Sequence, residues 1–147
     1  MGERVFVRAR EGAVSTSVAL PDLRVLVVDD DADMRELMAM ILGTSGARTQ
    51  CTGSCAEALA VFARERPDVV VADIGLPDED GYALIRKIRA LPIADGGRVP
   101  AVALTGFGAA EDKERAVSAG YQRCLTKPVE PDVIVATIAE LGRRGVD

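Results

Sequence analysis

The chain has 147 residues, of which 48% are hydrophobic and 28% charged, so it is long and apolar enough for one domain with a filled core. Its 23 acidic and 18 basic residues give a formal net charge of −5, which argues against general electrostatic binding to nucleic acid or an anionic membrane surface. No apolar run approaches the ~20 residues of a spanning helix. The N-terminus also lacks a signal-peptide pattern, so we expect a cytoplasmic protein.

Cysteine usage gives no sign of a disulfide framework or a zinc site. The three cysteines do not form an even set, and the chain has no histidine to complete a zinc site. We therefore expect reduced thiols at Cys51, Cys55 and Cys124.

Residues 1–22 differ in pattern from the rest of the chain. Val5 to Val7 and Val14 to Leu20 flank an Arg-Glu-Gly sequence, which leaves a hairpin, an added strand and a poorly ordered leader open. We expect residues 1–22 to be a leader or linker with at most partial order, and residues 23–144 to form the domain.

From Leu23 onward, short β-branched runs alternate with longer segments of helical period. This alternation predicts five βα units around a doubly wound parallel sheet, an α/β fold. The expected strands are Arg24–Asp29, Arg48–Cys51, Asp68–Asp73, Val99–Thr105 and Gln122–Thr126. The first, third and fourth are nearly continuous Val, Leu and Ala, which suits strands covered by helices on both faces.

The segments between the strands show apolar residues at helical spacing, so each can cover one face of the sheet. These residues are Met34, Leu37 and Ile41; Leu59 and Phe62; Leu84, Ile85, Ile88 and Leu91; and Ile134, Ile138 and Leu141. The segment Ala109–Ser118, beyond Thr105, is rich in charged residues and has few large apolar ones. We expect a weakly anchored and mobile helix there.

Polar side chains stand at the ends of four expected strands. Ligands of a doubly wound sheet bind at the carboxyl ends of its strands, so these residues are candidates for one site. The strands end in Asp29, Asp30 and Asp31; in Asp73; in Thr105; and in Thr126, Lys127 and Pro128. Carboxylates, a hydroxyl and an ammonium group are therefore expected to converge in one cleft.

The crowded carboxylates point to a metal ion. Carboxylates repel one another unless a cation lies among them, and hard oxygen ligands favour Mg²⁺ over zinc. Mg²⁺ is usually held by only one or two carboxylates, which leaves coordination positions open to phosphate oxygens. The sequence therefore predicts a magnesium site that can accept a phosphoryl ligand.

Asp73 is the candidate nucleophile of this site. It follows a rigid apolar strand and precedes a loop with Gly75, which leaves its carboxylate accessible. Lys127 would place a positive charge on the phosphate, and Thr105 would donate a hydroxyl hydrogen bond to it. The glycines of Gly106–Gly108 would let the following loop rearrange.

Each of these features also has a simpler interpretation. Asp31 and Asp33 lead into the first helix, where such residues most often cap the helix. A Lys-Pro pair often only ends a strand, and Thr followed by Gly often only makes a turn. The agreement of four strand ends favours a shared site.

Four stretches, taken in order, resemble the receiver domain of bacterial response regulators from Leu23 to about Leu141. They read Val-Leu-Val-Val-Asp-Asp-Asp, Asp-Val-Val-Val-Ala-Asp-Ile-Gly-Leu-Pro-Asp-Glu-Asp-Gly, Ala-Leu-Thr-Gly and Leu-Thr-Lys-Pro. The resemblance implies a flavodoxin-like (βα)5 sheet of strand order 2-1-3-4-5. It also implies aspartyl phosphorylation by a histidine kinase or histidine phosphotransfer protein, with self-catalysed phosphotransfer and slow dephosphorylation but no other enzyme activity. It leaves open whether the receiver stands alone or belongs to a hybrid histidine kinase.

The resemblance also implies a role for each site residue. The matching positions are the phosphoacceptor Asp73, the acidic pair Asp29 and Asp30, the metal-binding backbone carbonyl of Gly75, the switch hydroxyl of Thr105, and Lys127. Asp30 would contact the Mg²⁺ directly, and Pro128 would follow a cis peptide bond. A downstream protein would bind the face formed by Ala109–Leu141. Cys124 is a departure, because an aromatic residue or His often stands three positions before the lysine in this family.

Two other functions fit the sequence less well. A phosphatase of the haloacid dehalogenase type would need a second Asp two residues after Asp73, and that position is Gly75. A nucleotide-binding module would need a glycine-rich phosphate loop after the first strand, where Asp29–Asp31 stand instead.

Overall fold

The computed structural model describes residues 19–106 and 110–146 of the chain. Within these ranges five strands alternate with five α-helices, as the sequence predicts. The strands are β1 (Arg24–Val28), β2 (Arg48–Thr52), β3 (Val69–Asp73), β4 (Ala101–Thr105) and β5 (Arg123–Thr126). The helices are α1 (Ala32–Thr44), α2 (Cys55–Glu65), α3 (Gly81–Arg89), α4 (Ala110–Ala119) and α5 (Pro131–Val146), with a short 3-10 helix at Ile93–Asp95.

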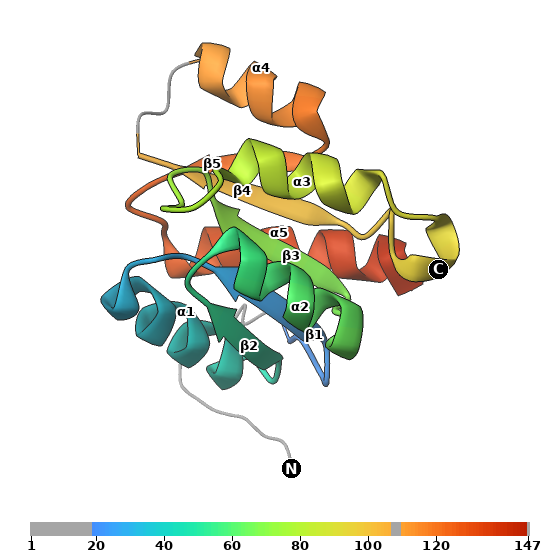
Figure 1. The fold of residues 1–147 in the computed structure, drawn as a ribbon. Coiled ribbons are helices and arrows are strands. Elements are labelled where there is room, and N and C mark those ends of the chain that lie inside the picture. Colours follow the sequence, from blue (N-terminus) through green and yellow to red (C-terminus); the bar gives the residue numbers. More distant parts are fainter. Residues whose placement is uncertain (1–18, 107–109, 147) are drawn as a thin grey trace.

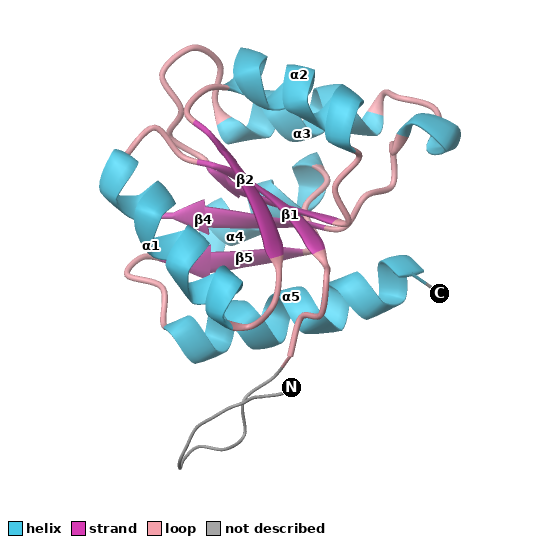
Figure 2. Ribbon diagram, turned by 90° about the horizontal axis from the view of Figure 1, so that it is seen from below, coloured by secondary structure: helices cyan, strands magenta, loops and turns pink. Residues whose placement is uncertain are grey.

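The strands form one parallel sheet in the order β2-β1-β3-β4-β5, which confirms the expected doubly wound, flavodoxin-like fold. Helices α2, α3 and α4 lie on one side of the sheet, and α1 and α5 lie on the other (Figures 1 and 2). This arrangement buries both faces of the central strands, which explains why β3 and β4 consist almost entirely of Val, Ala and Leu.

Two hydrophobic clusters, one on each face of the sheet, hold the layers together. The first contains Phe62 of α2, Ile85 and Ile88 of α3, and the buried Tyr121 that precedes β5. The second contains side chains of α1 and α5, among them Ile138. Burial of this apolar surface is the main favourable term in folding and fixes the helices against the strands.

The apolar stripe of α1 differs from the prediction. The structure buries Met38 and Leu42, whereas Leu37, expected in the core, is 42% exposed. α3 also ends at Arg89, so Leu91 lies beyond the helix and is partly exposed. These shifts move the boundaries and faces of two helices but leave the order of the layers unchanged.

The described part of the chain begins just before the first strand. Leu20 is buried in the second cluster, and its backbone N–H donates to the carbonyl of Ser45 at 2.7 Å. The expectations for Val5–Val7 and for Phe107 and Gly108 lie outside the described residues. No helix in the described ranges combines the length and the apolar character needed to cross a membrane.

Candidate functional site

The register of the sheet brings the predicted strand-end residues to one edge. Val28 pairs with Ala72, so Asp29 and Asp73, which follow them, leave adjacent strands at the same level. On the other side of β3, Asp73 pairs with Leu104 of β4, which places Thr105 one residue further along. Parallel pairing alone therefore gathers the carboxylates and the hydroxyl.

Three carboxylates form a compact group at this edge. Asp29, Asp30 and Asp73 each offer an oxygen, and these oxygens all lie within 4.8 Å of one another. Asp29 is fully buried and Asp73 nearly so, whereas Asp30 is exposed. The group is thus fixed at its base and open to solvent on one side.

Lys127 extends from the end of β5 into this acidic group. Its Nζ lies 3.0 Å from Asp29 Oδ2 and 3.4 Å from Asp73 Oδ2. Burial opposes the positive charge, but the hydrogen bond to Asp29 and the charges of both carboxylates outweigh it and raise the pKa of Lys127. The ammonium group therefore stays charged at neutral pH and partly neutralises the cluster.

Asp29 makes three further hydrogen bonds, two through its backbone and one through its carboxylate. Its N–H donates to the carbonyl of Thr52 at 3.0 Å, and its own carbonyl accepts from the Arg35 guanidinium at 2.8 Å. Its Oδ1 accepts from the backbone N–H of Asp31 at 2.9 Å. These bonds leave the carboxylate of Asp29 with a fixed direction.

Asp31 has the capping role that its position suggests. It is the N-cap residue of α1, and its side chain accepts a hydrogen bond from the backbone N–H of Asp33 at 2.9 Å. It belongs to the acidic sequence run but not to the group of three carboxylates.

Thr105 and Gly75 lie beside the acids. Thr105 is buried at the end of β4, and its carbonyl accepts from the backbone N–H of Lys127 at 2.8 Å. A Cβ placed on Gly75 would lie 3.9 Å from Asp73 Oδ2, so this backbone runs directly past the carboxylate. The Lys127–Pro128 peptide bond is cis, as the resemblance implied.

Cys124 lies half-buried on β5 and packs against the first hydrophobic cluster. Burial raises the pKa of its thiol, and the charge of Lys113 only partly offsets this effect. Two tyrosines, Tyr82 and Tyr121, belong to the same cluster. Tyr82 lies on α3, and Tyr121 lies two residues before β5.

One residue of the site region was missed by the sequence analysis. Asp78, in the loop after β3, accepts hydrogen bonds from the backbone N–H groups of Cys55 and Ala56 at the start of α2, at 2.9 and 3.0 Å. Asp80, two residues further on, is the N-cap of α3, and its side chain accepts from the backbone N–H of Ala83 at 2.9 Å. No local signal identifies Asp78, because its partners lie more than twenty residues away.

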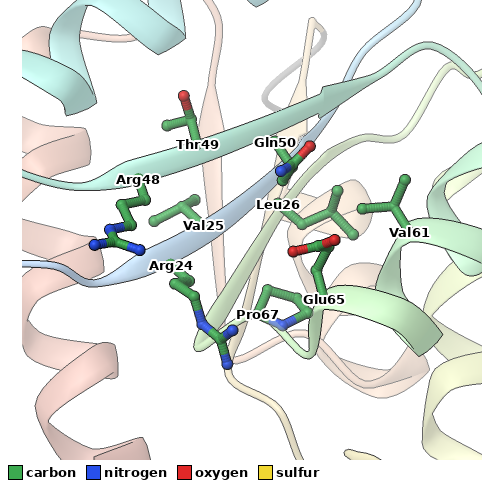
Figure 3. A pocket seen from close by; sticks show the side chains of 9 residues that line it. All are labelled: Arg24, Val25, Leu26, Arg48, Thr49, Gln50, Val61, Glu65 and Pro67. Carbon is green, nitrogen blue, oxygen red and sulfur yellow. The ribbon is translucent and has the colours of Figure 1, made fainter.

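Two hollows among the described residues lie away from the carboxylates. One, of about 160 Å³, lies at the amino ends of β1 and β2, where Arg24, Arg48 and Glu65 surround the side chains of Val25 and Leu26 (Figure 3). A second, of about 280 Å³, is lined by Phe62, Arg66, Ile93, Arg98 and other residues, also away from the carboxylates. Neither hollow brings together groups that match the strand-end chemistry.

The donor set of the acidic group fits a hard divalent cation. Three carboxylates within 4.8 Å of one another offer only oxygen ligands, which suit Mg²⁺ or Ca²⁺ rather than zinc. The exposure of Asp30 leaves room for water or another oxygen ligand on the metal. The group can therefore hold a metal ion and leave one side of it open.

Comparison with known proteins agrees with this geometry. The family model of the response regulator receiver domain matches residues 25–139. A relative from Leptolyngbya boryana, the "Uncharacterized 14.6 kDa protein in sodA1 3'region", is 37% identical over 121 residues, which cover 82% of this chain and 91% of that protein. The sensor histidine kinase RcsC of Salmonella typhimurium is 37% identical over 123 residues, which cover 84% of this chain but only 13% of the kinase.

Solved structures show the same architecture. A response regulator receiver domain protein from Methanospirillum hungatei superimposes with a TM-score of 0.76 at 26% identity, covering 85% of this chain and 97% of that one. Fold, acidic group and sequence similarity extend over the same residues. The chain therefore belongs to the response regulator receiver domain family.

Proposed function

We propose that Asp73 accepts a phosphoryl group from a phosphohistidine donor and that the chain thereby works as a two-component switch. The observation that carries this proposal is the arrangement of Asp73 beside Asp29, Asp30 and Lys127 at the carboxyl edge of the sheet. A carboxylate oxygen of Asp73 attacks phosphorus, and a P–O bond forms as the P–N bond to the imidazole breaks. The imidazole nitrogen keeps the electron pair and takes up a proton.

Lys127 and Thr105 act on the phosphoryl group once it is attached. Before the transfer, Lys127 forms ion pairs with Asp29 and Asp73. After the transfer, its ammonium group makes a charge-assisted contact with a phosphate oxygen. Thr105, buried at the end of the adjacent strand, supplies a hydroxyl hydrogen bond. Movement of Thr105 toward the phosphate connects the site to the segment that follows β4.

Mg²⁺ is the proposed metal of the acidic group. Asp30 would bind it directly, together with Asp29, Asp73 and the backbone carbonyl of Gly75. The oxygen-only donor set and its open side support this assignment. When bound, the ion supplies positive charge that neutralises the oxygens of the transferring phosphoryl group.

The partners follow from the two-component context. A histidine kinase is the partner that receiver domains of this family imply, and a kinase of this class, RcsC, contains a similar segment. We propose that a histidine kinase or histidine phosphotransfer protein donates the phosphoryl group to residues 23–144 as the receiver unit. A downstream protein would then bind the face of α4, β5 and α5, within Ala109–Leu141.

Uptake of phosphate from a small donor tests the proposal directly. Incubation with acetyl phosphate and Mg²⁺ should raise the intact mass of the chain by one phosphate group, and chelation of the metal should suppress this. Asp73→Asn should abolish the uptake. Asp31→Asn is the matched control, because Asn also caps a helix and Asp31 lies outside the group of three. Equal labelling of the Asp73→Asn variant would exclude Asp73 as the acceptor.

A further inference from the structure

The start of α2 carries a local cap. The Ser54 hydroxyl oxygen accepts from the backbone N–H of Glu57 at 3.2 Å, and the Glu57 carboxylate accepts from the backbone N–H of Gly53 at 2.8 Å. The pair resembles a capping box, but the Glu57 carboxylate binds the N–H of the residue before the N-cap Ser54. The local cap therefore satisfies the N–H of Glu57 and leaves those of Cys55 and Ala56 to another partner.

Asp78, in the loop after β3, provides a second cap for α2. The two carboxylate oxygens of Asp78 accept separately from the N–H groups of Cys55 and Ala56, at 2.9 and 3.0 Å. These hydrogen bonds lower the pKa of Asp78 to about 2, so the group is ionised at neutral pH. A negative charge at the positive end of a helix dipole gains further from this position.

The loop that Asp78 anchors is the loop that carries Gly75. At its base, the N–H of Ile74 donates to Leu104 of β4 at 3.0 Å, and the N–H of Gly81 donates to Ile74 at 2.8 Å. Asp78 fixes the middle of the same loop against a different element. The backbone beside the Asp73 carboxylate is thus held from both β4 and α2.

The segment leading into α2 is in turn tied to the strand that carries Asp29. The carbonyl of Thr52 accepts from the N–H of Asp29 at 3.0 Å. The Arg35 guanidinium donates to the carbonyl of Asp29, and a Cβ placed on Gly53 would lie 3.2 Å from the same guanidinium. The start of α2 and the segment leading into it are therefore hydrogen-bonded to both of the loops that carry the acids of the site.

We propose that Asp78 is a positioning residue for the metal site: it joins the Gly75 loop to the start of α2 and thereby holds the Gly75 backbone beside the Asp73 carboxylate. The inference rests on the proposed function, because it concerns the same metal. Loss of the Asp78 carboxylate frees the Gly75 loop from α2 while the local cap of that helix remains. The acids then keep their places at the ends of β1 and β3, but the backbone beside Asp73 is less well fixed.

The test compares Mg²⁺ affinity in four proteins: wild type, Asp78→Ala, Asp78→Asn and Ser54→Ala. Mg²⁺ is titrated and followed by amide NMR shifts, with urea unfolding measured on the same samples. Asp78→Ala should bind Mg²⁺ on the order of tenfold more weakly, as expected when a residue that supports metal ligands is removed. Asp78→Asn keeps one oxygen acceptor, so its Mg²⁺ affinity should lie between those of wild type and Asp78→Ala. It serves as a milder variant if Asp78→Ala folds poorly.

Ser54→Ala separates positioning from simple helix stability. It removes a cap of the same helix but leaves the bond from α2 to the Gly75 loop, so it should lower stability without changing Mg²⁺ affinity. Faster amide exchange at residues 74–80 in metal-free Asp78→Asn should accompany the loss. Mg²⁺ affinity within twofold of wild type in both Asp78 variants, or an equal loss in Ser54→Ala, overturns the inference. Wild type that shows no Mg²⁺ binding would instead remove the proposed function itself, and this inference with it.

Discussion

Lys127 sets the charge balance of the site at the level of single residues. Its ammonium group contacts Asp29, which is fully buried, and Asp73, which is nearly so. Buried carboxylates are costly unless a positive charge or hydrogen bonds compensate them. The same ammonium group that stabilises the acidic group is the one that we propose contacts an added phosphate.

Lys127→Ala should leave the fold intact but weaken the coupling between phosphorylation and conformational change. Removal of a charge-assisted contact to phosphate should reduce the preference for the active arrangement by about 1.5–3 kcal/mol. Amide NMR spectra with and without beryllofluoride, an acyl-phosphate mimic, measure this. Lys87→Ala is the control, since Lys87 pairs with Glu79 on the surface. The role assigned to Lys127 is wrong if wild type and Lys127→Ala show the same shifts.

The raised pKa of Lys127 predicts how its contribution to stability depends on pH. The folded-state pKa lies above that of the unfolded chain, so the ion pairs contribute fully below the unfolded value of about 10.4. The contribution is lost as pH rises through the folded-state pKa. The difference in unfolding free energy between wild type and Lys127→Gln should therefore shrink above about pH 10.4, as measured by urea unfolding. A difference that stays constant across this range would mean that Lys127 does not interact with the acids.

Helix α4 buries the fewest residues among the described helices. Ala116 is its buried residue, and the guanidinium of Arg115 lies 4.0 Å from the centre of the Tyr82 ring on α3. A cation–π contact of this kind is worth about 0.5–1 kcal/mol at an exposed site. A helix that buries so little apolar surface should change its position at low cost, so its mobility stays a prediction.

The small side chain of Cys124 should affect how α4 responds. Phosphorylation is expected to draw Thr105 inward and to bias α4 between two arrangements. Cys124 has no aromatic ring whose rotation could gate this movement, so the inactive and active states should lie closer in energy. Hydrogen exchange across α4 and β5, with and without beryllofluoride, should show modest changes in wild type. A Cys124→Tyr variant should show larger ones.

The exchange experiment also identifies the surface through which the signal leaves. Changes in α4 and β5 would support the proposed face for the downstream protein. Changes confined to the loops around Asp73, in wild type and in Cys124→Tyr alike, would mean that the signal leaves through another surface.

The elements differ in how far the sequence predicts them. β3 was predicted to within one residue, because an unbroken apolar run followed by Asp73 fits few other structures. The buried face of α1 was predicted only in part: Met34 and Ile41 pack against the second cluster, but Leu37 is exposed. Large apolar residues occur all around this helix, so several stripes fit equally well. The cap that Asp78 gives α2 could not be predicted at all, because it depends on how two distant loops meet in the folded sheet.

At the scale of the whole molecule, two hydrophobic clusters hold a group of mutually repelling acids at the sheet edge. Strand register places Asp29 and Asp73 side by side, so these two acids cannot separate without loss of strand pairing. Folding therefore prepares the metal site in advance. Because a ligand that binds only the folded state stabilises it, metal binding and folding stability are linked.

Mg²⁺ should raise the free energy of unfolding of the whole domain. At a concentration ten times its dissociation constant, the gain should be about 1.4 kcal/mol. Thermal or urea unfolding with Mg²⁺ and with a chelator measures this difference. Asp30→Asn should reduce the gain, whereas Asp31→Asn, outside the group of three, should keep it. A chain equally stable with and without Mg²⁺ would argue against a metal site at these acids.

The close approach of Asp29, Asp30 and Asp73 also has a consequence for protein engineering and evolution. Like charges placed close together for function lower the stability of the folded chain, so replacing one acid by Asn should relieve repulsion in the metal-free chain. A search for thermostable variants that ignores signalling should therefore recover neutral residues at Asp30 or Asp73 early. Receivers that have lost the phosphoacceptor should arise by the same route, and each should be more stable than its ancestor but unable to signal by phosphorylation.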